Sequence, residues 1–188
     1  MNQIWLVRHG ETEWTISKQH TGRTDVELTA AGEDEARALA PLLAGHEFAA
    51  VYTSPMKRAR RTAELAGFPD AVVDDALVEV DYGDYEGRTT ADIHKERPDW
   101  LLWRDGTPGG ESMADAGRRA DGVRDRIEAI EGDVLVFGHG HFTRVLGARL
   151  LDLPPETGGR LILGPGSLSI IGSEHNLRAI QTWNRTKI

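Results

Sequence analysis

The sequence predicts an α/β fold, in the form of a single-domain, three-layer α/β/α sandwich around a mostly parallel sheet. Short apolar runs at 4–7, 49–52 and 134–137 alternate along the chain with longer amphipathic stretches. Such runs are typical of strands covered on both faces, and strands that alternate with helices form parallel sheets with helices on both sides. The chain has 188 residues and contains no repeat, linker or low-complexity segment. We therefore expect one domain over 1–188.

The first strand, at 4–7, is followed by a polar stretch rich in Thr and Gly and then by a helix. Thr29 is a residue type that caps helices, because its hydroxyl accepts a hydrogen bond from the first turn. Beyond it, apolar side chains recur every three or four residues, as one face of a helix requires. Gly45 predicts the end of this helix, since glycine readily adopts the left-handed conformation found there.

A second strand at 49–52 leads to a second helix. Ser54-Pro55 combines a preferred cap residue with proline at the first helical position, which predicts a helix start at this point. Residues 71–80 predict an extended segment, and DYGDYEG after them predicts a loop. Thr89, with an acidic residue three positions later, predicts the start of another helix.

The second half of the chain repeats this alternation. Apolar residues from Ser112 onward recur at helical spacing, and 134–137 is a fully apolar strand that runs into GHGH. A helix follows and is ended by Pro154-Pro155. In the tail, 160–183, Leu and Ile patches separated by GPGS and GSEHN predict a hairpin or two edge strands.

The composition argues against several classes of protein. A net charge of -8 argues against a surface for nucleic acid or anionic membranes, which requires a basic face. The absence of cysteine excludes disulfides, thiolate metal sites and cysteine nucleophiles. No apolar stretch approaches the roughly 18–20 residues of a membrane span, and no signal-like segment opens the sequence. We expect a cytoplasmic protein.

The three apolar strands end in RHG, TSP and GHGH. The carboxyl ends of parallel neighbours meet at one edge of a sheet. We therefore expect Arg8, His9, Arg58 and His139 to converge there. Each of these residues taken alone could simply end a strand or begin a helix. That explanation does not account for the occurrence of all four at the same edge of the sheet.

This cluster suits the chemistry of a phosphate monoester. Guanidinium groups bind phosphate oxygens in bidentate fashion, and a neutral imidazole among them can attack phosphorus to form a phosphohistidine. The neighbouring cations lower the pKa of that histidine and favour its neutral form. An acid must protonate the departing alkoxide, and the loop VEVDYGDYEG offers four. They are Glu79, Asp81, Asp84 and Glu86, among which this reasoning does not choose.

Five segments, LVRHGETEW, TGRTDVELTAAG, YTSPMKRARRTAELAG, EVDYGDYEG and VFGHGH, together resemble the histidine phosphatase superfamily, also called the phosphoglycerate mutase-like family. The resemblance extends from residue 4 to about residue 151 and implies the phosphoglycerate mutase-like fold. It also implies a role for each residue of the cluster. These roles are nucleophile for His9, phosphate clamps for Arg8 and Arg58, cationic phosphate ligand for His139 and proton donor for Glu79.

Within the superfamily, HTGRTDVELT, DYGDYEG, WRDG and GHGHFTR look most like acid and sugar-phosphate phosphatases, including the sedoheptulose-bisphosphatase type. Trp14 is followed by Thr15, where the mutases usually carry asparagine, and the longer insertions of cofactor-dependent mutases are absent. The resemblance implies that Arg104 grips a distal phosphate or sugar hydroxyl, the alternative being an ordinary surface position. His20 and His141 are further candidates for lining the pocket. The expected substrate contacts are Thr15, Thr21, Gly22, Tyr82, Arg104 and Gly140.

Three functions follow from these observations. We expect a phosphatase without metal or cofactor that hydrolyses a small, sugar-like phosphomonoester through a phosphohistidine on His9. The alternative is a phosphoglycerate mutase that uses the same intermediate. A binding protein for phosphorylated ligands ranks last, because neither the nucleophile nor the acid has been lost. We expect no nucleic-acid or membrane partner, and the β-rich tail offers strands for pairing in a homodimer.

Overall fold

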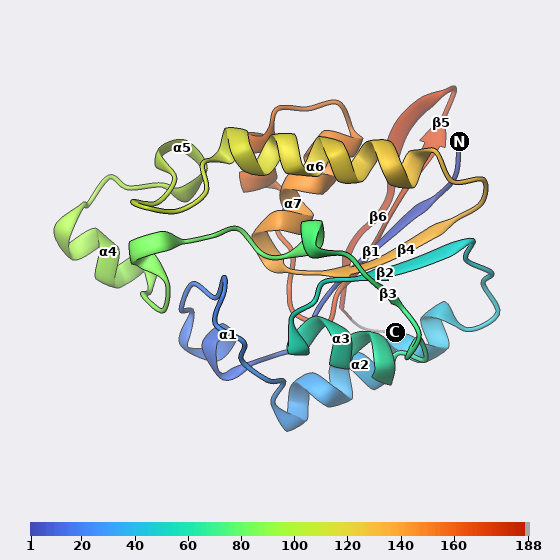
Figure 1. Cartoon of the computed structure of the whole chain (residues 1–188), viewed down its shortest axis with the longest axis horizontal. Coiled ribbons are helices and arrows are strands. Elements are labelled where there is room, and N and C mark those ends of the chain that lie inside the picture. Colours follow the sequence, from blue (N-terminus) through green and yellow to red (C-terminus); the bar gives the residue numbers. More distant parts are fainter. Residues whose placement is uncertain (187–188) are drawn as a thin grey trace.

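A six-stranded sheet lies at the centre of the computed structural model, which describes residues 1–186 (Figure 1). Its strands are β1 (Ile4–Arg8), β2 (Ala50–Thr53), β3 (Val72–Val73), β4 (Val134–Gly138), β5 (Leu168–Glu174) and β6 (Leu177–Arg185). They lie in the order β3-β2-β4-β1-β5-β6. The first four in this order are parallel, whereas β5 is antiparallel to β1 and to β6. The predicted mostly parallel sheet is confirmed.

Helices cover both faces of the sheet (Figure 1). They are α1 (Glu13–Ser17), α2 (Ala30–Leu43), α3 (Lys57–Leu65), α4 (Thr90–Glu96), α5 (Leu102–Asp105), α6 (Met113–Glu128) and α7 (Gly140–Leu150). α2 and α3 pack on one face, α6 and α7 pack on the other, and the three short helices lie in connections beyond the sheet. This is the predicted three-layer sandwich. Within residues 1–186, no helix combines the length and the apolar character needed to cross a membrane.

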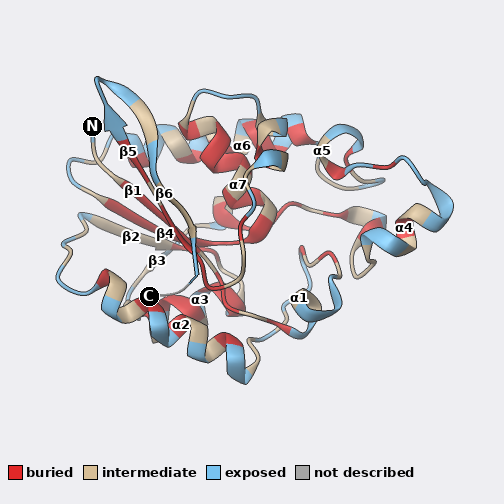
Figure 2. Cartoon of the chain, turned by 180° about the vertical axis from the view of Figure 1, so that it is seen from behind, coloured by how far each residue is buried: buried red, intermediate tan, exposed pale blue. Residues whose placement is uncertain are grey.

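Each face of the sheet has its own apolar core (Figure 2). Along β1, Ile4 and Leu6 belong to the core beneath α6 and α7, whereas Trp5 and Val7 belong to the core beneath α2 and α3. Successive side chains of a strand point to opposite faces. A central strand of this sheet therefore needs an unbroken apolar run, which explains why β1 and β4 can be recognised in the sequence.

Threonine or serine side chains cap the start of three of the helices. The hydroxyls of Thr29, Thr89 and Ser112 each accept a hydrogen bond from the backbone N–H three residues later, at 3.0–3.1 Å. Each of these bonds satisfies one backbone donor that the first helical turn leaves free. The predicted starts of α2, α4 and α6 are confirmed.

The predicted start of α3 at Ser54-Pro55 is wrong. The helix begins at Lys57, whose backbone N–H donates to the carboxylate of Asp25 at 2.8 Å. The hydroxyl of Ser54 accepts a longer hydrogen bond from the N–H of Met56, at 3.3 Å, and is also hydrogen-bonded to Nε2 of His139 at 2.7 Å. The carboxylate of Asp25, from a distant loop, thus caps the first residue of α3, and Ser54 contributes to the strand-end cluster.

The segment 71–80 is extended over a shorter range than predicted. Only Val72–Val73 pair as β3, and Asp75–Leu77 form a single 3₁₀ turn. The cause is local, because the carboxylate of Asp74 accepts a hydrogen bond from the N–H of Ala76 at 2.8 Å. In the tail, the predicted hairpin is confirmed as β5 and β6.

The carboxyl ends of β1, β4 and β2 lie side by side, as predicted. Arg8 is in register with Gly138, and Thr53 with Phe137. Just beyond β1, the N–H of His9 donates to the carbonyl of Gly138 at 3.0 Å. The polar residues that follow these strands therefore meet at one edge of the sheet.

Candidate active site

A cleft of about 280 Å³ opens beyond the carboxyl ends of the central strands. Side chains from the end of β1, from α1 and the loop after it, from the acidic loop and from the first turns of α7 line it. The predicted site residues in its wall are Arg8, His9, Thr15, Thr21, Glu79, Tyr82 and Gly140. Arg58 and His139 are completely buried beside His9, whereas Gly22 and Arg104 do not line the cleft.

A larger hollow of about 580 Å³ lies over α3 and β3 and contains none of the predicted site residues. Most of its charged side chains pair with one another, as Glu33 does with Arg61 and Glu27 with Lys57. The smaller cleft is therefore where the chemically capable residues gather.

His9 presents a free ring nitrogen to the cleft. Its Nδ1 lies 2.8 Å from the carbonyl oxygen of Gly10. A carbonyl oxygen only accepts hydrogen bonds, so Nδ1 carries the hydrogen and the lone pair of the neutral ring is on Nε2. Nε2 is thus the atom of His9 that can attack phosphorus.

The surroundings of His9 keep it neutral. Burial is the main reason why its pKa lies well below the ordinary value, and Arg58 and Arg8 lower it further. The hydrogen bond to Gly10 acts in the opposite direction. The neighbouring cations therefore lower the pKa of His9, as expected, although burial lowers it more.

His139 uses both of its ring nitrogens within the protein. Nε of Arg58 donates to Nδ1 at 3.2 Å, so the hydrogen is on Nε2, which donates to Ser54 Oγ. Burial, followed by Arg58, holds the pKa of His139 well below its ordinary value. The ring is therefore neutral in this arrangement. The expected cationic phosphate ligand would need the added negative charge of a phosphate, and that role stays a prediction.

Backbone carbonyls hold the two predicted arginine clamps. Arg58 donates from Nη1 to Thr24 at 3.0 Å and from Nη2 to Gly22 at 3.1 Å. Arg8 donates from Nη1 to Leu163, and its Nε is buried without a partner among the described residues. Because these carbonyls carry no net charge, the charge of both guanidinium groups stays available to an anion.

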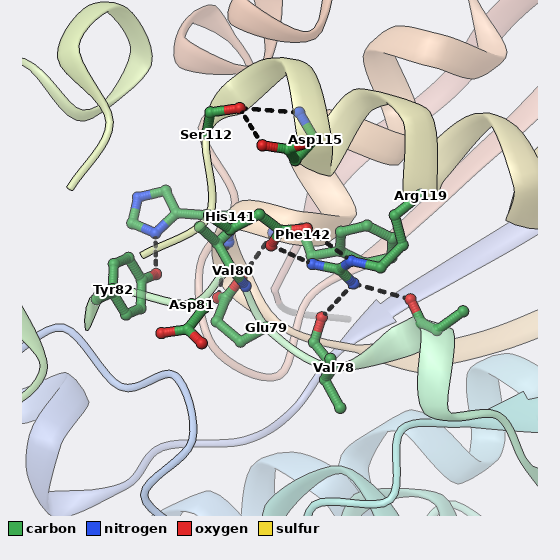
Figure 3. A network of polar contacts seen from close by, with 12 residues as sticks. Val78, Glu79, Val80, Asp81, Tyr82, Ser112, Asp115, Arg119, His141 and Phe142 are labelled. Atoms are coloured by element: carbon green, nitrogen blue, oxygen red, sulfur yellow. Dashed lines mark hydrogen bonds and ion pairs between the residues drawn. The ribbon is translucent and has the colours of Figure 1, made fainter. Parts of the chain in front are cut away.

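Glu79 differs from the other three candidate acids by lining the cleft. Its Oε1 accepts hydrogen bonds from the N–H groups of Val80 at 2.8 Å and Phe142 at 2.7 Å, and its Oε2 from that of His141 at 2.9 Å (Figure 3). Two of these donors belong to the first turn of α7, where a negative charge is favoured. The carboxylate of Glu79 is thereby fixed beside the histidine cluster.

The other three acids, Asp81, Asp84 and Glu86, are not among the lining residues. Glu86 accepts hydrogen bonds from the backbone N–H groups of Gly22 at 2.9 Å and Thr24 at 3.0 Å. Gly22, an expected substrate contact, is thus tied to the acidic loop. The proton-donor role that the resemblance implied for Glu79 stays a prediction, and its position is compatible with that role.

Arg119 holds the segment that carries Glu79 (Figure 3). Its Nη1 donates to the carbonyl of Val78 at 2.8 Å, and Nη2 pairs with Glu111 at 2.6 Å. Its guanidinium carbon lies 3.8 Å from the ring centroid of Phe142. One partly buried arginine therefore contacts both the chain before Glu79 and the helical turn that donates to it.

Arg104, an expected substrate contact, lies outside the cleft and has other partners. Its guanidinium donates to the carboxylate of Asp105 at 2.8 Å and to the carbonyl of Asp99. The side chain is exposed, and the adjacent acid binds the charge that a distal phosphate would need. Substrate binding by Arg104 stays a prediction without a contact to the cleft.

Four further residues with ionisable side chains line the cleft, namely Lys18, His20, His141 and Arg144. The two histidines were candidates, and His141 is hydrogen-bonded through Nδ1 to the hydroxyl of Tyr82. Lys18 and Arg144 were not anticipated. A signal for Arg144 exists, because residues three apart share a helix face and Arg144 follows His141 at that spacing.

The chain is similar to known phosphatases, and to a mutase, in sequence and in structure. The profile of the histidine phosphatase superfamily (branch 1) matches residues 4–186. An acid phosphatase of Mycobacterium tuberculosis is 42% identical and covers 95% of this chain and 90% of its own length. Sedoheptulose 1,7-bisphosphatase of Saccharomyces cerevisiae is 38% identical, and the match covers 76% of this chain and 65% of that protein. A "probable phosphoglycerate mutase" of Yersinia enterocolitica is 34% identical, and the match covers 97% of this chain and 90% of that protein. A solved structure from Mycobacterium tuberculosis superposes with a TM-score of 0.94 at 39% identity over 98% of both chains.

Proposed function

This chain belongs to the histidine phosphatase superfamily and is a phosphoric monoester hydrolase, and from that premise we propose a substrate class and a mechanism. The substrate is a small, sugar-like phosphomonoester, and its phosphoryl group passes through His9 to water. The free Nε2 of His9, directed by the Gly10 carbonyl and surrounded by buried arginines, carries this proposal.

In the first step, the lone pair of His9 Nε2 attacks phosphorus while the bond from phosphorus to the departing oxygen breaks. Arg8 and Arg58 balance the charge of the phosphoryl oxygens. For this step the carboxylate of Glu79 must first take up a proton, which the negative charge of the bound phosphate favours. Glu79 then gives that proton to the departing alkoxide. The products are a free alcohol, a phosphohistidine and a Glu79 carboxylate.

In the second step, water attacks phosphorus, the phosphorus–nitrogen bond breaks and neutral His9 is restored. The Glu79 carboxylate takes a proton from that water and returns to its starting form. Inorganic phosphate leaves. The cycle consumes one water and needs no electron donor or metal.

The size and polarity of the cleft support a small substrate. A volume of about 280 Å³ lies near the lower end of the range of roughly 300–1,000 Å³ found for ligand pockets. Hydroxyl, imidazole and amide groups are prominent in its wall, which suits the hydroxyls of a sugar. The names of two relatives, an acid phosphatase and a sedoheptulose bisphosphatase, point in the same direction.

A phosphoglycerate mutase remains the second candidate because of the Yersinia relative. A mutase would use the same phosphohistidine but would return the phosphoryl group to the bound product. The cleft would then have to exclude water between the two transfers. Interconversion of 2- and 3-phosphoglycerate with negligible phosphate release would favour this candidate.

The decisive experiment compares wild type with His9→Ala and the control His175→Asn. His175 is an exposed histidine in the β5–β6 turn, with φ 48°, a conformation that asparagine tolerates. Phosphate release is measured with EDTA and no added metal on sugar phosphates, 3-phosphoglycerate and p-nitrophenyl phosphate. We expect His9→Ala to lose at least about 1,000-fold in activity, while His175→Asn matches wild type.

Near-normal hydrolysis by His9→Ala would refute the phosphohistidine mechanism. Loss of release in EDTA that added metal restores would refute metal independence. Phospho-ligand binding without either hydrolysis or isomerisation would support the binding-protein alternative.

A further inference from the structure

The backbone that carries Glu79 belongs to no helix or strand. Residues 78–82 lie between two single 3₁₀ turns, Asp75–Leu77 and Gly83–Tyr85. Glu79 and its two neighbours are nevertheless buried, so the backbone groups there need partners within the protein. A carboxyl group that delivers a proton must also be held close to the oxygen that receives it. The side chains that hold this segment therefore bear on the reaction.

Arg119, in α6, holds the chain before Glu79. Its Nη1 donates to the carbonyls of Ala76 and Val78, each at 2.8 Å (Figure 3). The ring of Phe142 packs against its guanidinium, and the backbone N–H of Phe142 donates to the Glu79 carboxylate at 2.7 Å. Arg119 thus contacts two structures that fix Glu79, the segment before it and the first turn of α7.

Glu111 supports the same segment from the other side. Its carboxylate binds Arg119 in bidentate fashion, accepting from Nε at 2.9 Å and from Nη2 at 2.6 Å. Such a pair fixes the plane of the guanidinium. The backbone N–H of Glu111 donates to the carbonyl of Asp81 at 2.8 Å. The ion pair is therefore tied to the chain both before and after Glu79.

This ion pair differs from the arginines that surround His9. Neither Arg119 nor Glu111 lines the cleft, and each compensates the charge of the other. The two side chains are only 19% and 14% exposed. Burying an ion pair costs solvation free energy, and apolar side chains in its place often give equal or greater stability. The hydrogen bonds to the Glu79 segment give this pair a use that stability alone does not.

We propose that Arg119 and Glu111 position the carboxyl group of Glu79 for proton transfer to the departing oxygen. The inference rests on the proposed function, in which Glu79 is the proton donor. Arg119 is then a positioning residue, because it acts through Glu79 and contacts neither the substrate nor the phosphate. Without its side chain, the carbonyls of Ala76 and Val78 lose their partner and the carboxyl group is displaced. A displacement of about 1 Å can slow a reaction about 100-fold.

The test compares kcat/KM on two substrates. The alkoxide of glycerol 3-phosphate needs a proton, whereas p-nitrophenolate leaves without one. The quantity to follow is kcat/KM on p-nitrophenyl phosphate divided by kcat/KM on glycerol 3-phosphate. A loss of folded protein lowers both values equally and leaves this ratio unchanged.

The variants are Arg119→Gln, Glu79→Gln and the double variant that combines them. The matched control is Arg149→Gln. Arg149 is likewise partly buried and forms an ion pair with α6, to Asp121 at 2.7 Å. Its other hydrogen bond runs to the carbonyl of Leu153, away from the segment that carries Glu79.

We expect Arg119→Gln to raise the ratio about five- to tenfold, while Arg149→Gln stays within about twofold of wild type. In the double variant, Arg119→Gln should change the ratio of Glu79→Gln by less than about twofold, because no proton donor remains to be positioned. A wild-type ratio in Arg119→Gln overturns the proposal. So does a further five- to tenfold rise in the double variant, roughly the effect in the wild-type background.

If Arg119→Gln does not fold, Glu111→Gln carries the same comparison. It keeps the backbone N–H to Asp81 and one oxygen for Arg119 but removes the charge. We expect the ratio to rise about three- to fivefold there, and a ratio within about twofold of wild type overturns the proposal.

Failure of the proposed function has different signatures. His9→Ala would then retain hydrolysis, or Glu79→Gln would leave the ratio unchanged, and the second result removes the basis of this inference as well. If the inference alone fails, His9→Ala and Glu79→Gln behave as expected and only the Arg119 and Glu111 variants keep the wild-type ratio.

Discussion

One hydrogen bond on each ring separates the chemistry of His9 from that of His139. The two ring centroids are 5.2 Å apart, and both residues are followed by glycine at a strand end. The Gly10 carbonyl can only accept, so His9 carries its hydrogen on Nδ1, whereas Arg58 can only donate, so His139 carries its hydrogen on Nε2. Similar sequence contexts thus give one histidine a lone pair toward the cleft and tie the other into the protein.

Replacing Glu79 by Gln should reduce activity to an extent that depends on the leaving group. An alkoxide needs a proton as it departs, whereas p-nitrophenolate leaves without one. We expect kcat/KM of Glu79→Gln to fall by about 100-fold or more on glycerol 3-phosphate, but by less than about 10-fold on p-nitrophenyl phosphate. This parameter reports the first transfer, so the hydrolysis of the phosphohistidine does not obscure the comparison.

Asp84→Asn is the matched control for Glu79, because Asp84 lies in the same acidic loop but is exposed and outside the cleft. It should keep wild-type kcat/KM on both substrates. Equal losses on the two substrates in Glu79→Gln would argue against proton donation by this residue.

Residues placed by strand ends could be predicted from the sequence, and residues placed by distant contacts could not. Arg8, His9 and His139 flank apolar runs, so sheet geometry alone brings them together. Glu79 required the family resemblance, because its position depends on backbone donors in α7, more than 60 residues later. Arg144 was missed for the same reason, since carbonyls beyond its own helix orient it.

At the scale of elements, the loop after β1 rests directly on the first turn of α2. A Cβ on Gly10 would lie 2.2 Å from the carbonyl oxygen of Gly32, and a Cβ on Gly32 would lie 2.1 Å from that of Glu11. Backbone atoms cannot move aside as a flexible side chain can. The helix N-terminus therefore sets the position of the loop that carries His9.

Gly32→Ala should destabilise the protein although alanine is the better helix former. We expect the free energy of unfolding to fall by about 2–3 kcal/mol, because the added methyl group displaces the loop backbone. Activity should fall as well, since the loop carries the nucleophile. Urea denaturation and phosphate release on p-nitrophenyl phosphate measure the two effects.

Gly122→Ala provides the comparison within α6. The nearest atom to its added Cβ is Arg126 Nη1 at 3.9 Å, so nothing resists the methyl group. This variant should gain about 0.4–1 kcal/mol in stability and keep its activity. If Gly32→Ala is also stabilising, the contact between the loop and α2 does not position His9.

The apolar pattern of the sequence predicts whether a segment is a strand or a helix better than it predicts where that strand or helix begins and ends. Strands β1 and β4 and helix α6 could be predicted because the pattern of apolar residues in each sequence segment follows the pattern of buried positions without interruption. The start of α3 was wrong because Asp25, a residue from another segment, caps it. A boundary decided by such a contact has no local signal in the sequence.

At the scale of the whole molecule, the fold keeps a cluster of histidines neutral. Burial is the largest cause of lowered pKa values in His9, His20, His139 and His141. Once unfolded, each of them would take up a proton near its ordinary pKa of 6.5. The folded protein therefore binds fewer protons than the unfolded chain at mildly acidic pH, and folding becomes less favourable there.

The free energy of unfolding should accordingly decrease as the pH falls below about 6.5, by up to about 1.4 kcal/mol per pH unit for each of these histidines, and should show no such loss above that pH. Urea denaturation at pH 7.5, 6.5 and 5.5 measures the slope. His20→Phe should reduce this slope by the contribution of one histidine. Nε2 of His20 is buried without a hydrogen-bond partner in the described chain, so the substitution leaves no other group without a partner. Equal stability of the wild type at pH 5.5 and 7.5 would mean that these histidines are protonated in the folded protein, and a neutral His9 nucleophile at acidic pH would then be untenable.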